Sequence, residues 1–329
     1  MAVYTSVGDA ALTDFLADYD VGELLSAKGI AEGVENTNYL LRATAGTFIL
    51  TLYEQRVRRE DLPFFLGLMS HCADRGIATP RPVPRRDGSV LTELCGRPAA
   101  LVTFLDGLAS RRPGPAHCAE LGTALAAFHD AAADFTITRE NGLGPSAWAP
   151  LFAQSRDAAD GVIDGLRALV DDELEALSAL WPTDLPQGVI HADLFPDNVF
   201  FIGPRLSGLI DFYFACNDIL AYDLAICINA WCFEDDGAFN VTKARALIAG
   251  YEAVRPLGDA EREALPVLCR GAALRFLLTR LHDWLRVPDS AILTPKPPRP
   301  YQQRLIFHRS VANAAEYGLV VSSIAAGCA

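Results

Sequence analysis

The spacing of the apolar residues changes character near Leu105, and this change limits the possible folds more than any other feature. Before Leu105, apolar residues occur in short runs that are typical of strands, at 22–31, 37–44, 47–54, 89–94 and 98–105. A short helix is expected over 9–20, and a second over 59–75 that ends at Gly76. We therefore predict an α+β chain in which residues 1–105 form a small, mostly antiparallel sheet with one helix against it.

Residues 106–329 are predicted to form a larger and mostly helical lobe. Helical spacing recurs in six segments, at 115–133, 148–159, 170–180, 218–233, 241–254 and 259–286. A β island interrupts them between Gly188 and Asp211, where Gly203-Pro204 predicts the turn of a hairpin. The five prolines of Val287–Pro300 indicate a surface loop.

The β island carries the polar residues with the clearest chemistry. It contains His191-Ala-Asp193-Leu-Phe-Pro-Asp197-Asn198, and Asp211 follows Asn198 by 13 residues, after the predicted hairpin. Phosphoryl transfer needs a carboxylate that orients or deprotonates the attacking hydroxyl, and hard oxygen ligands for Mg²⁺. The alternative is a hairpin whose polar residues only cap turns. The second Asp after a hairpin, placed behind a β-rich lobe, favours a kinase.

These residues resemble the aminoglycoside phosphotransferase and choline kinase family, which has the protein-kinase-like two-lobe fold. Ala192 stands where protein kinases have Arg, so a kinase of small molecules is favoured. Within the family, Gly33–Tyr39, Leu50–Glu54 and Asp211–Asp218 together resemble the homoserine kinases, which act in threonine biosynthesis. The resemblance implies ATP, Mg²⁺ and an amino-alcohol substrate.

The resemblance also implies roles for single residues. Asp193 would be the catalytic base, with Asn198 and Asp211 as metal ligands. His191 and Asp223 would hold the backbone of the catalytic loop. Nucleotide-binding positions are expected in three places, which are the polar loop between the first two strands, the third strand and the hinge-like segment Leu101–Gly107: Asn36, Thr37, Asn38, Thr51, Thr103 and Leu105.

One position departs from the pattern of kinases of this fold. Many of them place a Lys on the third strand to hold the nucleotide phosphates, but this chain has Thr51 there, and a hydroxyl cannot supply that charge. The chain has only three lysines, Lys28, Lys243 and Lys296. The substitute could be Lys28, Arg42 or an arginine of 56–59, or the metal and the Asn36–Asn38 loop could suffice. The loop could equally be a tight turn.

The substrate pocket is expected around the predicted helix that ends near Trp284. Arg280 falls on its apolar stripe and would bind a substrate carboxylate or pair with Glu234 or Asp283. Weaker candidates are Arg275, Asn229 and Trp231, the last also explained by core packing. Glu234 contributes to an acidic wall for an ammonium group. The expected substrate is L-homoserine; the alternatives are choline, ethanolamine, an aminoglycoside or a methylthio-sugar, or a pseudokinase without turnover.

Charge and cysteine usage limit the partners and the compartment. The 41 acidic and 28 basic residues give a net charge of −13, which disfavours binding to nucleic acid and to anionic membranes. Eight cysteines lie in apolar contexts without a C-x-x-C pair, as in a reducing compartment. Neither a secretion signal nor a membrane span is recognisable, so a cytoplasmic enzyme is expected. No oligomeric state is indicated.

Overall fold

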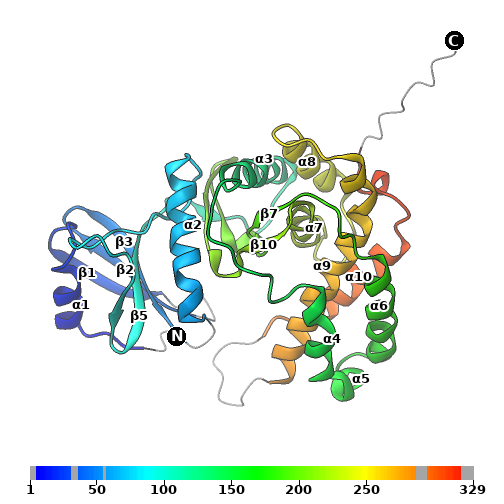
Figure 1. Ribbon diagram of the computed structural model, residues 1–329, viewed down its shortest axis with the longest axis horizontal. Coiled ribbons are helices and arrows are strands. Elements are labelled where there is room, and N and C mark those ends of the chain that lie inside the picture. The colour runs from blue at the N-terminus through cyan, green and yellow to red at the C-terminus, as the bar shows by residue number, and fades with distance from the viewer. Residues whose placement is uncertain (1–4, 31–35, 55–56, 287–294, 320–329) are drawn as a thin grey trace, which may run out of the picture.

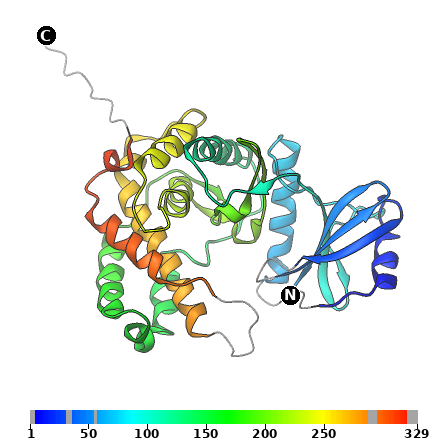
Figure 2. The same cartoon turned by 180° about the vertical axis from the view of Figure 1, so that it is seen from behind.

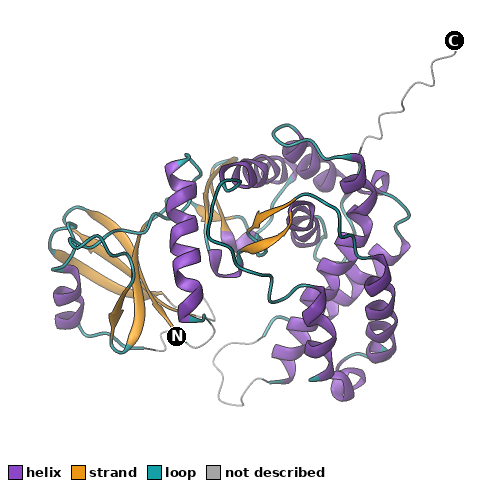
Figure 3. Cartoon of the chain, viewed as in Figure 1, coloured by secondary structure: helices purple, strands orange, loops and turns teal. Residues whose placement is uncertain are grey.

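The computed structural model describes residues 5–30, 36–54, 57–286 and 295–319, and every structural statement below concerns these residues. Two lobes lie side by side along the longest axis of the molecule, with the strands gathered mainly in one and the helices mainly in the other (Figures 1 and 3). This is the predicted α+β two-lobe fold.

The N-terminal lobe is built on one antiparallel sheet with the strand order β1-β2-β3-β5-β4. Its elements are α1 (Asp9–Leu16), β1 (Leu24–Ile30), β2 (Asn36–Ala43), β3 (Gly46–Tyr53), a 3-10 turn (Arg59–Asp61), α2 (Leu62–Asp74), β4 (Thr92–Leu94) and β5 (Arg97–Thr103). The strands form because alternate apolar residues of β2, β3 and β5, such as Leu41, Leu50 and Leu101, are buried against α1. Helix α2 lies between this sheet and the C-terminal lobe in both views (Figures 1 and 2).

Helix α2 joins the two lobes into one packed structure. Its buried residues Phe65 and Met69 belong to the same apolar cluster as Tyr53 of β3 and the core of the C-terminal lobe. The helix stops where Gly76 takes the left-handed conformation, with φ of +81°, as its position in the sequence predicts. The sheet is therefore held against the C-terminal lobe by continuous apolar packing.

The C-terminal lobe consists mainly of helices around two small sheets. Its helices are α3 (Pro115–Ala131), α4 (Pro145–Ala153), α5 (Ala159–Val162), α6 (Leu166–Leu180), α7 (Leu220–Trp231), α8 (Val241–Glu252), α9 (Asp259–Leu285) and α10 (Arg299–Ser310). Its strands are β6 (Leu108–Ala109), β7 (Gln187–Ile190), β8 (Val199–Ile202), β9 (Arg205–Leu209) and β10 (Cys216–Ile219). Strand β7 pairs with β10, and β8 lies between β6 and β9. These two small sheets carry the segment with the candidate catalytic residues.

Helices α3 and α8 pack unusually closely because each has a glycine at the contact. A Cβ atom on Gly122 would lie 2.0 Å from the carbonyl oxygen of Leu247, and one on Gly250 would lie 2.2 Å from that of Ala119. Any larger residue would push the helices apart.

Several expectations about local structure need correction. Asn36–Asn38 do not form a loop, because they pair in register with Thr51–Tyr53 at the start of β2. Residues 31–35, which include Gly33 and Glu35 of the expected loop, lie outside the described residues, as does Arg56 of the expected arginine cluster. The predicted helix 148–159 is divided into α4, a 3-10 turn (Arg156–Ala158) and α5.

Some elements were not predicted at all. Strands β6 and β10 are too short to show a period, and α10 follows directly on a proline-rich segment. Pro300 is tolerated in α10 because it lies in the first turn, where backbone amides have no intrahelical acceptor. Of the helices described, none has the length and apolar character needed to cross a membrane.

Candidate active site

The loop that follows β7 brings the predicted base and one predicted metal ligand into direct contact. The side-chain amide of Asn198 donates to the backbone carbonyl of Asp193 at 2.8 Å and to its carboxylate at 3.0 Å. Ala192, one residue earlier, has a positive φ of 64°, which is strained for a residue with a side chain. Tertiary contacts must therefore hold this loop in place.

Asp223, at the first turn of α7, supplies one of these contacts. Its carboxylate accepts hydrogen bonds from the backbone amides of His191 at 2.7 Å and Ala192 at 2.9 Å. It also lies 3.2 Å from a ring nitrogen of His129. Burial opposes the charge on Asp223, but the contacts with His129 and His191 outweigh it and lower the pKa of Asp223. The carboxylate thus stays ionised and accepts hydrogen bonds from the loop backbone.

Two residues considered for the substrate pocket, Arg275 and Trp231, donate hydrogen bonds to the backbone of this loop. Arg275 is 2% exposed and donates to the carbonyl oxygen of Ala192 at 2.7 Å, with its guanidinium 4.5 Å from the ring centre of Phe276. Trp231 donates its indole N–H to the carbonyl oxygen of Leu194 at 2.7 Å. A third candidate, Asn229, donates to carbonyl oxygens inside the core.

The hairpin β8–β9 returns the chain so that Asp211 comes near Asp193. Ile210, the residue before Asp211, is held by two hydrogen bonds. Its amide donates to the carbonyl oxygen of Asn198 at 3.0 Å, and its own carbonyl oxygen lies 3.1 Å from Nε2 of His191. Burial lowers the pKa of His191 to about 4, so its ring is neutral at pH 7 and Nε2 donates. Asp211 itself has a positive φ of 66° and is exposed.

The two carboxylates influence one another. Burial raises the pKa of Asp193 well above its ordinary value, and the nearby charge of Asp211 raises it further. Asn198 and Asp211 offer the neutral and anionic oxygen donors that Mg²⁺ prefers, and Mg²⁺ commonly takes its other ligands from phosphates and water. The described residues contain no cluster of three or more His, Cys, Asp or Glu residues that could hold a metal alone. The donor set therefore fits a metal that arrives with a nucleotide.

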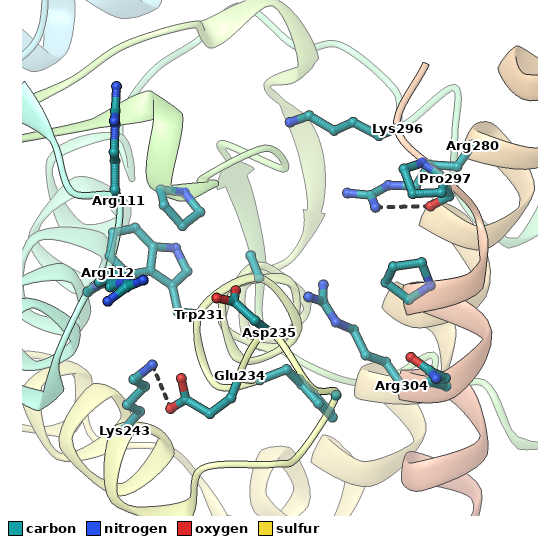
Figure 4. Close-up of a pocket in the computed structure, with 17 residues that line it drawn as sticks. Arg111, Arg112, Trp231, Glu234, Asp235, Lys243, Arg280, Lys296, Pro297 and Arg304 are labelled. Carbon is teal, nitrogen blue, oxygen red and sulfur yellow. Dashed lines mark hydrogen bonds and ion pairs between the residues drawn. The ribbon is translucent and has the colours of Figure 1, made fainter. Parts of the chain in front are cut away.

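A cavity of about 610 Å³ adjoins this loop through Pro196 (Figure 4). Basic side chains outnumber acidic ones along its wall: the basic residues are Arg111, Arg112, Lys243, Arg280, Lys296 and Arg304, and the acidic residues are Glu234 and Asp235. Lys296 and Arg280 lie together at one end, and Lys243 and Glu234 at the other (Figure 4). Such a wall suits a zwitterion, because it offers both signs of charge within one cavity.

Arg280 lines this cavity and is not paired with Glu234. It donates to the carbonyl oxygen of Pro297 at 3.3 Å, and its guanidinium lies 4.4 Å from the ring centre of Tyr301. Glu234 instead forms an ion pair with Lys243 at 2.8 Å. Arg304 of α10 also lies 4.4 Å from the Tyr301 ring centre, and sequence reasoning missed it because α10 was not predicted.

The positions expected at the nucleotide lie on the N-terminal lobe and the connection between the lobes. Thr51 is 2% exposed and donates to the side-chain oxygen of Asn38 at 2.8 Å. Thr37 donates to Glu54 at 2.8 Å, and the side-chain oxygen of Asn36 accepts from the amide of Glu54 at 3.4 Å.

The two positions expected in the hinge-like segment, Thr103 and Leu105, both have contacts within the protein. Thr103 accepts from the amide of Arg81 at 2.9 Å, and Leu105 packs over Gly208. Lys28 and Arg42 are exposed side chains of β1 and β2.

A link between the lobes was also missed by sequence reasoning. The hydroxyl groups of Tyr53, at the end of β3, and Tyr213, two residues after Asp211, are 3.3 Å apart, and their rings meet edge to face. Nothing in the sequence pairs these tyrosines, which are 160 residues apart.

Comparison with known proteins shows the family to which the chain belongs. A model of the phosphotransferase enzyme family matches residues 26–257. The chain belongs to this family. The homoserine kinase of Methylobacterium radiotolerans is 62% identical to this phosphotransferase over 318 residues, which cover 97% of this chain and 99% of that relative. The homoserine kinase of a Bradyrhizobium species is 60% identical over 323 residues, 98% of this chain and 100% of that relative.

Solved structures show the same architecture. An aminoglycoside phosphotransferase from Alicyclobacillus acidocaldarius matches 93% of this phosphotransferase, and 95% of its own chain is covered, with a TM-score of 0.65 at 17% identity. At this identity the likeness shows the fold alone. The predicted family and the protein-kinase-like two-lobe fold are thus confirmed.

Proposed function

We propose that this phosphotransferase transfers the γ-phosphoryl group of ATP to the hydroxyl of L-homoserine and forms O-phospho-L-homoserine, a step of threonine biosynthesis in the cytoplasm. The observation that carries the proposal is the cavity of both charge signs beside the Asp193 loop. Relatives named homoserine kinase, 60–62% identical over nearly the whole chain, support it.

In the proposed reaction, Asp193 receives the proton of the substrate hydroxyl as the oxygen attacks phosphorus. The raised pKa of this carboxylate makes it a stronger base than an ordinary Asp. Asn198 and Asp211 would hold Mg²⁺, which when bound neutralises charge on the nucleotide phosphates. Asp223, His191, Arg275 and Trp231 keep the loop in its strained form, so the base is in place before substrate binds.

ATP would lie between the lobes. We place its base at the connecting segment, near Thr103 and Leu105, and its phosphates under the start of β2 and the middle of β3, where Asn36, Thr37, Asn38 and Thr51 lie. Thr51 and Asn38 are hydrogen-bonded to each other and are uncharged. These side chains therefore shape the surface under the phosphates and do not supply a positive charge to them.

L-Homoserine fits the cavity because it carries a carboxylate, an ammonium group and the reacting hydroxyl. Arg280 would bind the carboxylate, with Arg304 beside it, and Glu234 and Asp235 would face the ammonium group. Choline and ethanolamine have no carboxylate, so the arginines would repel rather than bind them. A choline site would instead need a cage of aromatic faces.

A panel of alcohols in a coupled ADP-release assay tests the proposal. Homoserine should be phosphorylated far faster than choline, ethanolamine or a methylthio-sugar, whereas preference for one of those alcohols would reject homoserine as the substrate. Arg280→Met should raise the KM for homoserine about 10-fold or more, because it removes a charged hydrogen-bond donor.

The matched control for Arg280→Met is Arg156→Met. That substitution removes a cation whose ion pair with Asp171, at 2.6 Å, lies on the surface between the α4 and α6 segments, so homoserine kinetics should not change. An unchanged KM in Arg280→Met would move the carboxylate role to another cation of the cavity. A turnover assay with Mg-ATP also decides between an enzyme and a pseudokinase.

A further inference from the structure

We propose that Lys296 supplies the positive charge that faces the phosphoryl group during its transfer. The inference rests on the proposed function and deepens it, because it names a residue that could supply positive charge in place of the missing third-strand lysine. Thr51 stands at that position, is almost fully buried, and has its hydroxyl bonded to Asn38.

Lys296 is an exposed side chain next to the catalytic loop. Its ammonium nitrogen is 3.0 Å from the carboxylate of Asp197 and 5.3 Å from the ring centre of Phe195. Phe195 and Asp197 are the second and fourth residues after Asp193, and Asn198 comes next. The ammonium group is therefore beside the segment that carries both the base and a metal ligand, at the end of the cavity that also holds Arg280 (Figure 4).

The charge of Lys296 is available for a new partner. The side chains of Lys296 and Asp197 are 61% and 62% exposed, and ion pairs at such exposed positions contribute little stability. An incoming phosphoryl group carries more charge than one carboxylate, so the ammonium group can exchange Asp197 for phosphoryl oxygens at little cost.

Two other cations near the loop or the substrate pocket, Arg275 and Lys243, already have partners. Arg275 is buried and bonded to the carbonyl of Ala192, and Lys243 is paired with Glu234 at the far end of the cavity. The third lysine, Lys28, is exposed on β1 of the other lobe. Among the described lysines, Lys296 is thus the one placed to reach the reacting groups.

The proposed step needs a cation that does not change its protonation. The substrate oxygen forms a bond to the γ-phosphorus, its proton moves to Asp193, and the bond from the γ-phosphorus to the bridging oxygen breaks, leaving its electron pair on ADP. Negative charge is spread over the three equatorial oxygens in the transition state. Lys296 stays protonated and donates hydrogen bonds to those oxygens, so its interaction is strongest in the transition state and should appear in kcat.

Kinetics of Lys296→Met test the proposal. We expect kcat to fall about 100-fold, the usual effect of removing one transition-state donor, while the KM for homoserine changes less than about 3-fold. Lys296→Arg keeps the charge and should recover at least about a tenth of the wild-type kcat. Asp197→Asn removes only the resting partner of Lys296 and should change kcat less than about 3-fold, and Arg156→Met again controls for loss of a surface cation.

A binding measurement separates this role from a structural one. Wild-type enzyme with substrate should bind Mg-ADP much more tightly when aluminium fluoride mimics the transferred group, and calorimetry should show most of this gain lost in Lys296→Met with Mg-ADP affinity itself unchanged. Wild-type kcat in Lys296→Met, a change confined to the KM, or an equal loss in Asp197→Asn would each overturn the proposal. The variants are assayed with whichever alcohol the wild type prefers, so failure of the homoserine assignment would be seen separately.

Discussion

Asn198 donates its side-chain amide to the carboxylate of Asp193 at 3.0 Å, so the proposed metal ligand and the proposed base are directly connected. This hydrogen bond fixes which way the Asn198 amide faces: the NH₂ group is used on Asp193, and the oxygen is left for a cation. Loss of the Asn198 side chain is therefore expected to affect both the metal and the orientation of the proposed base.

The base is tested by Asp193→Asn. This variant keeps the shape of the side chain but removes the proton acceptor, so kcat should fall by about two or more orders of magnitude. Mg-ATP binding, measured by calorimetry, should persist. Near-wild-type turnover at saturating substrate would show that another group accepts the proton.

The metal ligands are tested by comparing Asp211→Ala with Asn198→Ala. Asp211 is an anion and Asn198 a neutral amide, so loss of Asp211 should weaken Mg-dependent nucleotide binding more. Calorimetric titrations of Mg-ATP against both variants measure the order. A greater loss in Asn198→Ala would reverse the assignment.

Asp193→Asn is also expected to make the free protein more stable at neutral pH. Burial and Asp211 raise the pKa of Asp193 in the folded state, so its ionisation there costs folding free energy. The gain should be present near pH 7 and should disappear as the pH falls below the raised pKa towards 3.8, the ordinary value for an Asp, because the wild-type carboxyl is then neutral too. Thermal unfolding without Mg²⁺ at several pH values checks this, and a stability difference independent of pH would contradict it.

The support of the loop is tested by Asp223→Asn. The carboxylate accepts from two backbone amides, whereas an Asn side chain has only one accepting oxygen and would leave a buried amide unpaired. We expect a loss of about 2–3 kcal/mol in the free energy of unfolding by urea, together with a lower kcat. Asp171→Asn, which removes the charge of a surface ion pair, is the control and should change neither. Wild-type stability and kcat in Asp223→Asn would show that the loop does not depend on this carboxylate.

The sequence alone predicted the two-lobe fold and that Asp193, Asn198 and Asp211 would come close to one another in the proposed catalytic loop. Both depend on local signals. Apolar periods of two and 3.6 residues predict strands and helices. The interval from Asp193 through Asn198 to Asp211 spans one hairpin, and the Gly203-Pro204 turn signal lies within that interval. The expected role of Asp223 came from the family resemblance, and its hydrogen bonds to the amides of His191 and Ala192 support it.

Only the tertiary structure decided which distant residues surround that loop. Asn36–Asn38 became strand residues because partners in β3 and Glu54 satisfy their polar groups, which their composition does not reveal. Arg275 lies outside the cavity lining and donates to the loop backbone, whereas Trp231 lines the cavity and also donates its indole N–H to the loop backbone. Lys296 lies next to Asp197 although 99 residues separate them, because α10 packs against α9 and carries the preceding segment to the loop. Contacts of this kind depend on how whole helices pack against one another. The spacing of residues within one segment does not predict them.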